Sequence, residues 1–309
     1  MKYDILHRTH YAYAAPARDN YNDVRLEPPA IPEQTLEFYS LTVEPAATLR
    51  RYKDFYSNLV HHFEIPKPHD TLLIESRLRV DTRWPAATAE DARLCPLEKL
   101  GGALDAERCF DYLQSSRYIE LDVDLWRFTL DAAKDKDDVW QVALALMRFT
   151  HSHLKYVPFS TDAHTHTRDL VKSPQGVCQD YAHFLIGLCR TAKIPARYVS
   201  GYLATEIASA THAWMEVFIP GHGWRALDPT HNCQIGETYV KIGHGRDYGD
   251  VAPVSGSYHG TLARRMNVEV KVTPLNADGQ PVGKKNEKPD EVPVEGLPEN
   301  DGVGQFGMI

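Results

Sequence analysis

The stretch SPQGVCQDYAH, from Ser173 to His183, decides the fold of this chain. Apolar residues recur at helical spacing after Cys178, and the pattern stops at Pro195, which lacks an amide proton and cannot continue a helix. Cys178 is therefore predicted to begin a helix. At that position, the helix dipole and the unpaired backbone amides favour the thiolate, which is the nucleophilic form of cysteine.

The predicted helix has one apolar face, and this face includes a second cysteine. Its members are Cys178, Tyr181, Leu185, Leu188, Cys189 and Ala192. Because a helix rises about 1.5 Å per residue, Cys189 lies roughly three turns from Cys178, which is too far for a disulfide. We therefore predict that Cys189 packs in the core.

Three strands are predicted after the helix, over 196–202, 212–219 and 224–228. If residues 220–222 form the turn between the last two, Asp228 becomes the diagonal neighbour of His212 on the same face of the sheet. A turn that is one residue longer would move Asp228 to the other face. The sequence alone leaves this register open.

These residues can supply the three groups of a catalytic triad. Cys178 would be the nucleophile, His212 its general base, and Asp228 the carboxylate that orients the imidazole. In the alternative interpretation, Cys178 is a core thiol, His212 a satisfied strand histidine and Asp228 a turn residue before Pro229. Spacing alone does not separate the two interpretations.

Four ordered blocks of sequence resemble the core of the bacterial transglutaminase-like superfamily. They are GVCQDYAH at 176–183, IPARYVSGY at 194–202, HAW at 212–214, and Gly223-Trp224 followed by Asp228-Pro229-Thr230. The resemblance implies an α+β fold with a papain-like core, in which the helix bearing the cysteine packs on an antiparallel sheet. It also implies an antiparallel β-sandwich-like domain before this core, and catalytic roles for Cys178, His212 and Asp228 in that order.

The same resemblance implies thioester chemistry, although members of the family differ in their substrates. We expect a thiol-dependent enzyme that hydrolyses an amide or peptide bond. One alternative is amine transfer to protein glutamine, which cross-links proteins. A non-catalytic binding or scaffold protein on the same fold is the other, and inactive members typically lose at least one of the three catalytic residues, which are all present here.

Several further residues are candidates for the site. The amide of Cys178 is one expected oxyanion donor, and Tyr156, which resembles an upstream family tyrosine, or Gln175 is the other. Trp214 and Trp224 are candidates for the walls of a substrate channel, although an aromatic residue on a strand more often belongs to the core.

Three further features have two interpretations each. Lys193 stands where many relatives have glycine, so it requires either a left-handed conformation or a different helix cap. Arg197 and Asp247 either form an ion pair or contact the substrate. Residues 248–260 form either a loop near the active site or an ordinary surface connection.

Strand and helix patterns divide the chain into three parts. Residues 1–85 are predicted to form the β-rich domain, with strands at 3–13, 36–44, 59–65 and 71–82. Residues 86–274 are assigned to the catalytic core, which includes a helix near 137–154. Residues 275–309 are rich in Gly, Pro and acidic side chains, and we expect them to be a disordered tail.

The composition is that of an ordinary globular protein. The 309 residues carry a net charge of −8, so the chain lacks the basic excess that nucleic acids or anionic membranes attract. It also lacks an apolar run of about 18 residues, and its five cysteines are sparse and odd in number. We expect a soluble, cytoplasmic protein that acts on a protein, peptide or amide substrate; its oligomeric state is not predicted.

A metal site is the remaining alternative. His151, His153, His164 and His166 form two alternating pairs, which could place imidazoles on one strand face. Their spacing lacks the cysteine pairs or the helical His-Glu motif of zinc sites, and the chain has no calcium loop. The sequence therefore predicts neither a metal nor another cofactor.

Overall fold

The period-two pattern that begins at Tyr3 produces one long strand, β1 (Lys2–Glu27). In the computed structural model, which describes residues 1–282 apart from 104–105, 205–208 and 262–263, buried and more exposed side chains alternate along β1 from Tyr3 to Tyr13. This alternation allows β1 to form the centre of an antiparallel sheet with one face against a core.

Each half of β1 has its own neighbours in the sheet. The first half lies between β5 (His69–Thr82) and β14 (Arg264–Leu275), and the second half lies between β4 (Leu59–Ile65) and β13 (Val254–His259). Two outer strands complete the sheet, β2 (Gln34–Glu44) beside β5 and β3 (Arg50–Lys53) beside β4. One apolar cluster combines side chains from both halves, among them Tyr11, Val24, Phe63 and Leu72. The predicted antiparallel N-terminal region is thus present.

The last two strands correct the expected division of the chain. Residues 254–274 were assigned to the catalytic core, but β13 and β14 pair with β1 instead, and Lys2 faces Leu275. The segment 248–260 is not a loop, since it contains α7 (Tyr248–Val251) and β13. Strand propensity indicates that a segment is extended, but it does not identify the strand with which the segment pairs. Here the paired strands β1 and β14 are about 250 residues apart in the sequence.

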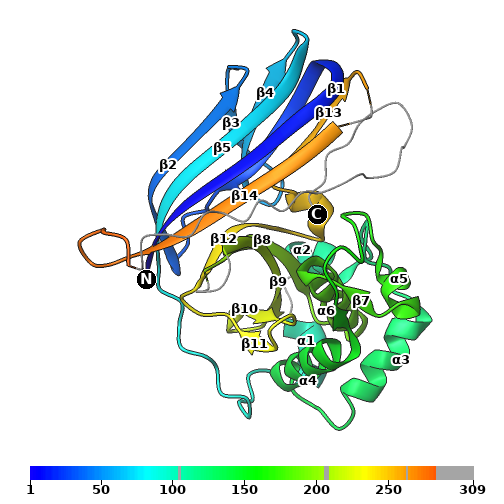
Figure 1. Cartoon of the computed structure of the whole chain (residues 1–309). Helices are drawn as coiled ribbons and strands as arrows, with labels where there is room; N and C mark the ends of the chain where they lie inside the picture. Colours follow the sequence, from blue (N-terminus) through cyan, green and yellow to red (C-terminus); the bar gives the residue numbers. More distant parts are fainter. Residues whose placement is uncertain (104–105, 205–208, 262–263, 283–309) are drawn as a thin grey trace.

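The core consists of a central helix on a second antiparallel sheet. This helix is α6 (Cys178–Thr191), and the sheet has the strand order β11-β10-β9-β8-β12. Its strands are β8 (Ala196–Ala204), β9 (Ser209–Ile219), β10 (Gly223–Asp228), β11 (Cys233–Gln234) and β12 (Tyr239–Gly245). The described residues therefore have the predicted α+β fold, with the helix that bears the cysteine packed on the sheet (Figure 1).

Three helices pack around α6, and the residue that precedes each of them has an extended backbone. They are α3 (Val123–Ala132), α4 (Val139–His153) and α5 (Thr167–Lys172). The carboxylates of Asp122 and Asp138 accept amide hydrogen bonds at the first turns of α3 and α4. The shorter elements are α1 (Leu97–Ala103), α2 (Ala106–Cys109), the 3₁₀ turn η1 (Phe110–Leu113), β6 (Lys155–Tyr156) and β7 (Gln175–Gly176).

The N-terminal sheet and the core share a buried interface. Tyr3, Ile5 and Leu78 of the N-terminal sheet pack against Tyr202 and Ile242 of the core sheet. Buried polar groups cross the same boundary, because the rings of His7 and Tyr202 are joined by a 2.9 Å hydrogen bond. The site described below therefore lies in a core that is braced on one side by the N-terminal sheet.

Expectations from the sequence also concern membrane-spanning segments and the C-terminal tail. Within the described ranges, no helix is long and apolar enough to cross a membrane. Most of the predicted disordered tail, residues 283–309, lies outside the described residues. Leu275, which the sequence assigned to the tail, is the last residue of β14.

Candidate active site

Cys178 is the first residue of α6, as the sequence predicts. The preceding residue, Val177, is extended, and its carbonyl accepts hydrogen bonds from the amides of Asp180 (2.9 Å) and Tyr181 (3.1 Å). Cys178 is partly exposed and packs against the core cluster, whereas Cys189, on the same helix, is fully buried. The thiol of Cys178 is thus placed at a helix N-terminus and within reach of solvent, which suits a nucleophile.

The turn before Cys178 is fixed by Asp180, which lies in the first turn of α6. The Asp180 carboxylate accepts hydrogen bonds from the Val177 amide (2.8 Å) and the Thr161 hydroxyl (2.6 Å). A β-carbon on Gly176 would lie only 2.6 Å from this side chain, so the position requires glycine. Burial raises the pKa of Asp180 to about 6, against the effect of these two hydrogen bonds.

His212 and Asp228 meet across the β9–β10 hairpin. Ile219 faces Gly223, which is the register that brings Asp228 to the same side of the sheet as His212. The Nε2 atom of His212 lies 2.7 Å from Oδ2 of Asp228, at hydrogen-bond distance. The shorter of the two turns considered for the sequence is therefore the one that forms.

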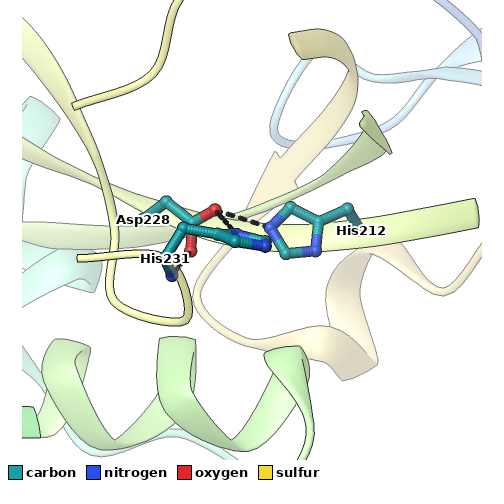
Figure 2. A group of neighbouring side chains, drawn as sticks. All are labelled: His212, Asp228 and His231. Carbon is teal, nitrogen blue, oxygen red and sulfur yellow. Dashed lines mark hydrogen bonds and ion pairs between the residues drawn. The ribbon is translucent and has the colours of Figure 1, made fainter. Parts of the chain in front are cut away.

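Asp228 is fully buried, and both of its oxygens accept hydrogen bonds. Figure 2 shows its contacts with His212 and His231. Besides His212, Oδ2 accepts hydrogen bonds from Nδ1 of His231 and from the Tyr239 hydroxyl, both at 2.8 Å. The other oxygen, Oδ1, accepts from the backbone amides of Thr230 and His231. Burial alone would raise the pKa of Asp228, but these hydrogen bonds hold it well below its usual range, so the carboxylate is ionised.

The charge of Asp228 changes the protonation of His212. Burial alone would lower the pKa of His212, but its interactions with Asp228 and with the Cys178 side chain raise it to about 10. His212 is therefore protonated at neutral pH. A charged imidazole held beside a cysteine by a buried carboxylate is an arrangement that can support nucleophilic attack by the sulfur.

His231 and Tyr239 are the residues of this site that sequence reasoning missed. His231 follows Asp228 by three positions in a turn that the Asp228 carboxylate closes, so an Asp-Pro-Thr-His turn was the available signal. Tyr239 is on β12, and no local pattern relates it to Asp228. The contact joins β12 to β10, which are separated by β9 and β8 in the strand order of the sheet, so a local sequence pattern could not reveal it.

The two candidate oxyanion residues lie directly beside the start of α6. Tyr156 pairs with Gly176 in the parallel β6–β7 ladder, and Gln175 pairs with Lys155. Both Tyr156 and Gln175 are exposed. Burial of part of the Tyr156 ring and the nearby Cys178 side chain raise the pKa of its hydroxyl, so the hydroxyl keeps its proton and can donate it.

The two tryptophans proposed for a substrate channel belong to packed regions instead. Trp214 is fully buried, lies 5.4 Å from the Tyr239 ring in a T-shaped contact, and is approached by Gly201, where a β-carbon would clash with the indole. The Arg197 guanidinium covers the face of Trp224 at 3.9 Å. The core interpretation therefore holds for Trp214, and Trp224 is a support for Arg197.

The structure shows the partners of Arg197 and Asp247 and the backbone conformation of Lys193. Arg197 pairs with Glu216 at 2.6 Å, and Asp247 accepts hydrogen bonds from the amides of Tyr118 and Gly249, so Arg197 forms an ion pair, but with Glu216 and not with Asp247. Lys193 has φ of +63°, the left-handed conformation that a glycine would adopt more easily.

Metal binding has two candidate sets of ligands. His151, His153, His164 and His166 do not gather into a cluster of potential ligands among the described residues. Their partners are a backbone carbonyl for His151, aromatic rings for His153, Tyr118 for His164 and Glu120 for His166.

The second set is His212, Asp228 and His231, whose ligand atoms lie within 4.8 Å of one another. Asp228 already forms hydrogen bonds with His212 at 2.7 Å and with His231 at 2.8 Å. An ion would have to displace the proton of His212, whose pKa is raised to about 10, so the donor set fits a hydrogen-bonded network better than a metal site.

Two family descriptions match the chain. Residues 3–81 match the bacterial transglutaminase-like N-terminal region, and residues 128–229 match the transglutaminase-like superfamily. The second range contains Cys178, His212 and Asp228.

Related proteins extend the match over most of the chain. An uncharacterised protein of Mycobacterium leprae is 31% identical over 279 residues, which cover 88% of this chain and 98% of that protein. A protein-glutamine gamma-glutamyltransferase of Pseudomonas aeruginosa is 35% identical over 102 residues, which cover 29% of this chain and 15% of that enzyme.

A solved structure has the same fold. It is a crystal structure from Cytophaga hutchinsonii, described as that of a candidate cysteine protease, and it matches with a TM-score of 0.76 and 24% identity over 92% of this chain and 94% of that one. The Mycobacterium protein aligns over nearly its whole length, and both family regions occur in the expected order. The chain therefore belongs to the transglutaminase-like superfamily, with the bacterial N-terminal region preceding the core.

Proposed function

We propose that this protein is a thiol-dependent acyl-transfer enzyme that hydrolyses an amide or peptide bond. The observation that carries the proposal is the 2.7 Å contact between His212 and a fully buried, ionised Asp228, with His212 also interacting with Cys178. A buried carboxylate that holds an imidazole beside a cysteine is the arrangement that activates thiol nucleophiles.

The proposed reaction has two halves. The Cys178 thiolate attacks the carbonyl carbon of the substrate, and the C–N bond breaks as His212 donates its proton to the leaving amine, which leaves a thioester on Cys178. His212, now neutral, then takes a proton from water, which attacks the thioester. The carboxylic acid product departs and Cys178 regains its thiolate form.

Donors near the start of α6 would stabilise the oxyanion of both tetrahedral intermediates. The amide of Cys178 is one, because the first amides of a helix have no acceptor within it. Tyr156 is the second candidate, since β6 holds it against Gly176. Gln175, on β7, has the weaker claim because its side chain is exposed and its backbone pairs with Lys155.

Amine transfer is the second candidate function. It is favoured by the 35% identity over 102 residues with the Pseudomonas protein-glutamine gamma-glutamyltransferase. The thioester is common to both reactions, and an amine replaces water as the group that resolves it. A non-catalytic role is the third candidate, and retention of all three catalytic residues argues against it.

The test is a screen of glutamine-containing and other peptides with the wild-type chain and Cys178→Ala. Peptide cleavage and ammonia release report hydrolysis, and incorporation of a fluorescent primary amine reports transfer. Cys95→Ala is the matched control, because Cys95 is a buried cysteine whose neighbours are Pro96 and Asp138. We expect Cys178→Ala to lose all turnover while it melts like the wild type. Turnover that survives in Cys178→Ala would overturn the proposal.

A further inference from the structure

A second histidine, His231, binds the carboxylate of the candidate active site. Its Nδ1 atom donates to Oδ2 of Asp228 at 2.8 Å, the same oxygen that accepts from His212 (Figure 2). The His231 side chain is 49% exposed, whereas that of Asp228 is 0% exposed. His231 therefore lies between the carboxylate and solvent.

The position of His231 is fixed by the turn that follows β10. Oδ1 of Asp228 accepts the amides of Thr230 (2.8 Å) and His231 (3.2 Å), so the same carboxylate binds both the backbone and the ring of His231. The ring is also 5.2 Å from that of His212, measured between centroids. Backbone and side chain thus direct His231 to one place beside the His212–Asp228 contact.

Few other ionisable groups surround this ring. From β9 it faces His212, from β10 Asp228, and from β12 the Tyr239 hydroxyl, which donates to the same Oδ2 and approaches Cys233 at 3.6 Å. From α4, His151 donates to the neighbouring carbonyl of Pro229. Asp228 is the single acidic group among them.

The bond between His212 and Asp228 depends on the exclusion of water. A water molecule that reached Oδ2 would compete with His212 for the same lone pairs and would allow the carboxylate to rotate. Tyr239 protects this oxygen from the buried side, where it is 5% exposed. On the solvent side the protecting group is His231.

We propose that His231 is a positioning residue, which holds Asp228 toward His212 and keeps water from the contact between them. The inference rests on the proposed function, because it assigns a role within the same thiol-activating site. His231 acts through Asp228 and does not touch the substrate carbonyl. Its required property is a hydrogen-bond donor at the place of Nδ1, not a charge.

Two substitutions separate the donor from the rest of the ring. His231→Ala removes the donor and opens the solvent side of Asp228. His231→Asn keeps an N–H donor one bond from Cγ, as Nδ1 is in histidine, but cannot be protonated near neutral pH. His222→Ala is the matched control, because His222 is an exposed histidine in the turn at the far end of the same hairpin.

The readout is the rate at which iodoacetamide alkylates Cys178 between pH 5 and 8, followed by mass spectrometry. This measurement needs no substrate. Loss of one hydrogen bond to a charged group should lower the rate at pH 6 by about threefold to tenfold in His231→Ala. The same variant should also shift the acid side of the rate–pH curve to higher pH. A less firmly held Asp228 would stabilise the Cys178 thiolate and the His212 imidazolium less.

The expected result is that His231→Asn restores the wild-type rate to within about twofold, while His222→Ala changes nothing. A wild-type rate in His231→Ala would overturn the inference. So would an equal loss in His231→Asn and His231→Ala, since the donor would then not be the required property. If Cys178 is not selectively alkylated in the wild type, the proposed function fails first, so the two failures are distinguishable.

Discussion

One buried carboxylate organises the residues of the candidate site. Asp228 has five hydrogen-bond donors around it, from His212, His231, Tyr239 and two backbone amides. These donors keep the carboxylate charged in a buried environment, and the charge in turn keeps His212 protonated. In the proposed mechanism, Asp228 therefore acts on Cys178 through His212.

This arrangement predicts the effect of Asp228→Asn. The amide can donate to Nε2 of His212, which favours the wrong tautomer and removes the charge that holds the imidazolium. We expect kcat/KM to fall by about 10²-fold to 10⁴-fold, yet to stay above that of Cys178→Ala, because the nucleophile remains. Steady-state kinetics on a substrate from the screen measure the difference.

A control for Asp228→Asn is Asp137→Asn, since Asp137 pairs with Arg93 at the surface with 71% of its side chain exposed. It should leave kcat/KM unchanged. Equal losses in Asp228→Asn and Cys178→Ala would contradict the separate roles given to the two residues.

At this scale, the sequence predicted only part of the site. The position of Cys178 follows from a helix pattern, and the approach of His212 to Asp228 follows from one choice of turn length. Tyr239 contacts Asp228 from a distant strand, whereas Asp180 binds the Val177 amide within the first turn of α6. A residue type and a spacing do not reveal a contact such as that of Tyr239, and for Trp214 they left both a core position and a channel wall open.

Among the elements, the core sheet is held together by a buried group of charges away from Asp228. Glu216 on β9 accepts from Arg197 on β8 at 2.6 Å and from Lys241 on β12 at 2.7 Å. Burial alone would raise the pKa of Glu216, but the two cations lower it to about 2. The three strands that carry these charges include the one that bears His212.

We predict that Glu216→Gln lowers the free energy of unfolding by about 3 kcal/mol at pH 7, because it removes the carboxylate that pairs with Arg197 and the buried Lys241. The pKa of Glu216 is lowered from 4.5 to about 2, so its stabilisation is present above pH 4.5 and is lost as the pH falls towards 2. The difference between wild type and variant should therefore shrink over that interval. Urea unfolding at a series of pH values measures it.

The surface pair Arg8–Glu269 provides the control, since both side chains are partly exposed. Glu269→Gln should cost at most about 1 kcal/mol. The buried charges would not stabilise the sheet if Glu216→Gln lowered the free energy of unfolding no more than Glu269→Gln does. The same conclusion would follow if the effect of Glu216→Gln did not shrink as the pH falls from 4.5 towards 2.

Helices and strands were predictable where the apolar pattern is regular. The predicted helix near 137–154 is α4, and the strands predicted at 59–65 and 71–82 are β4 and β5. The exposed β3, whose four residues have no apolar alternation, was missed. So was the pairing of β13 and β14 with β1.

The molecule as a whole is closed by its last two described strands. β14 pairs with β1 from Lys2 to Tyr13, so the N-terminal sheet needs residues from the end of the described chain. Val272 of β14 also joins Tyr3 and Tyr202 in the apolar interface with the core. The N-terminal region and the core are consequently one assembly and not a chain of two separate units.

This closure predicts the result of truncation. A chain that ends at Pro253 lacks β13 and β14, exposes one side of β1 and should lose cooperative thermal unfolding. A chain that ends at Val282 keeps every described element and should melt within about 2 °C of the full chain. Circular dichroism during heating compares the two. A normal melt after truncation at Pro253 would contradict the role of the closing strands.

For the whole molecule, the resemblance of four sequence blocks to the transglutaminase-like core predicted the fold class, and nothing in the sequence predicted the connection of β14 to β1. Pairing between strands so far apart in the sequence depends on the free energy of the whole sheet. A short stretch of sequence does not determine that free energy. The substrate, the cytoplasmic location and the choice between hydrolysis and amine transfer stay predictions.

The central claim is that Asp228 and His212 activate Cys178, and the most direct test is alkylation of all five cysteines in the native protein at pH 6. Cys178 and Cys233 are the two partly exposed thiols, and Cys233 serves as the internal reference, because burial raises its pKa. We predict that iodoacetamide modifies Cys178 at least about tenfold faster than Cys233, and that His212→Ala removes this advantage. Equal rates for the two cysteines, or a Cys178 rate that His212→Ala leaves unchanged, would contradict the account.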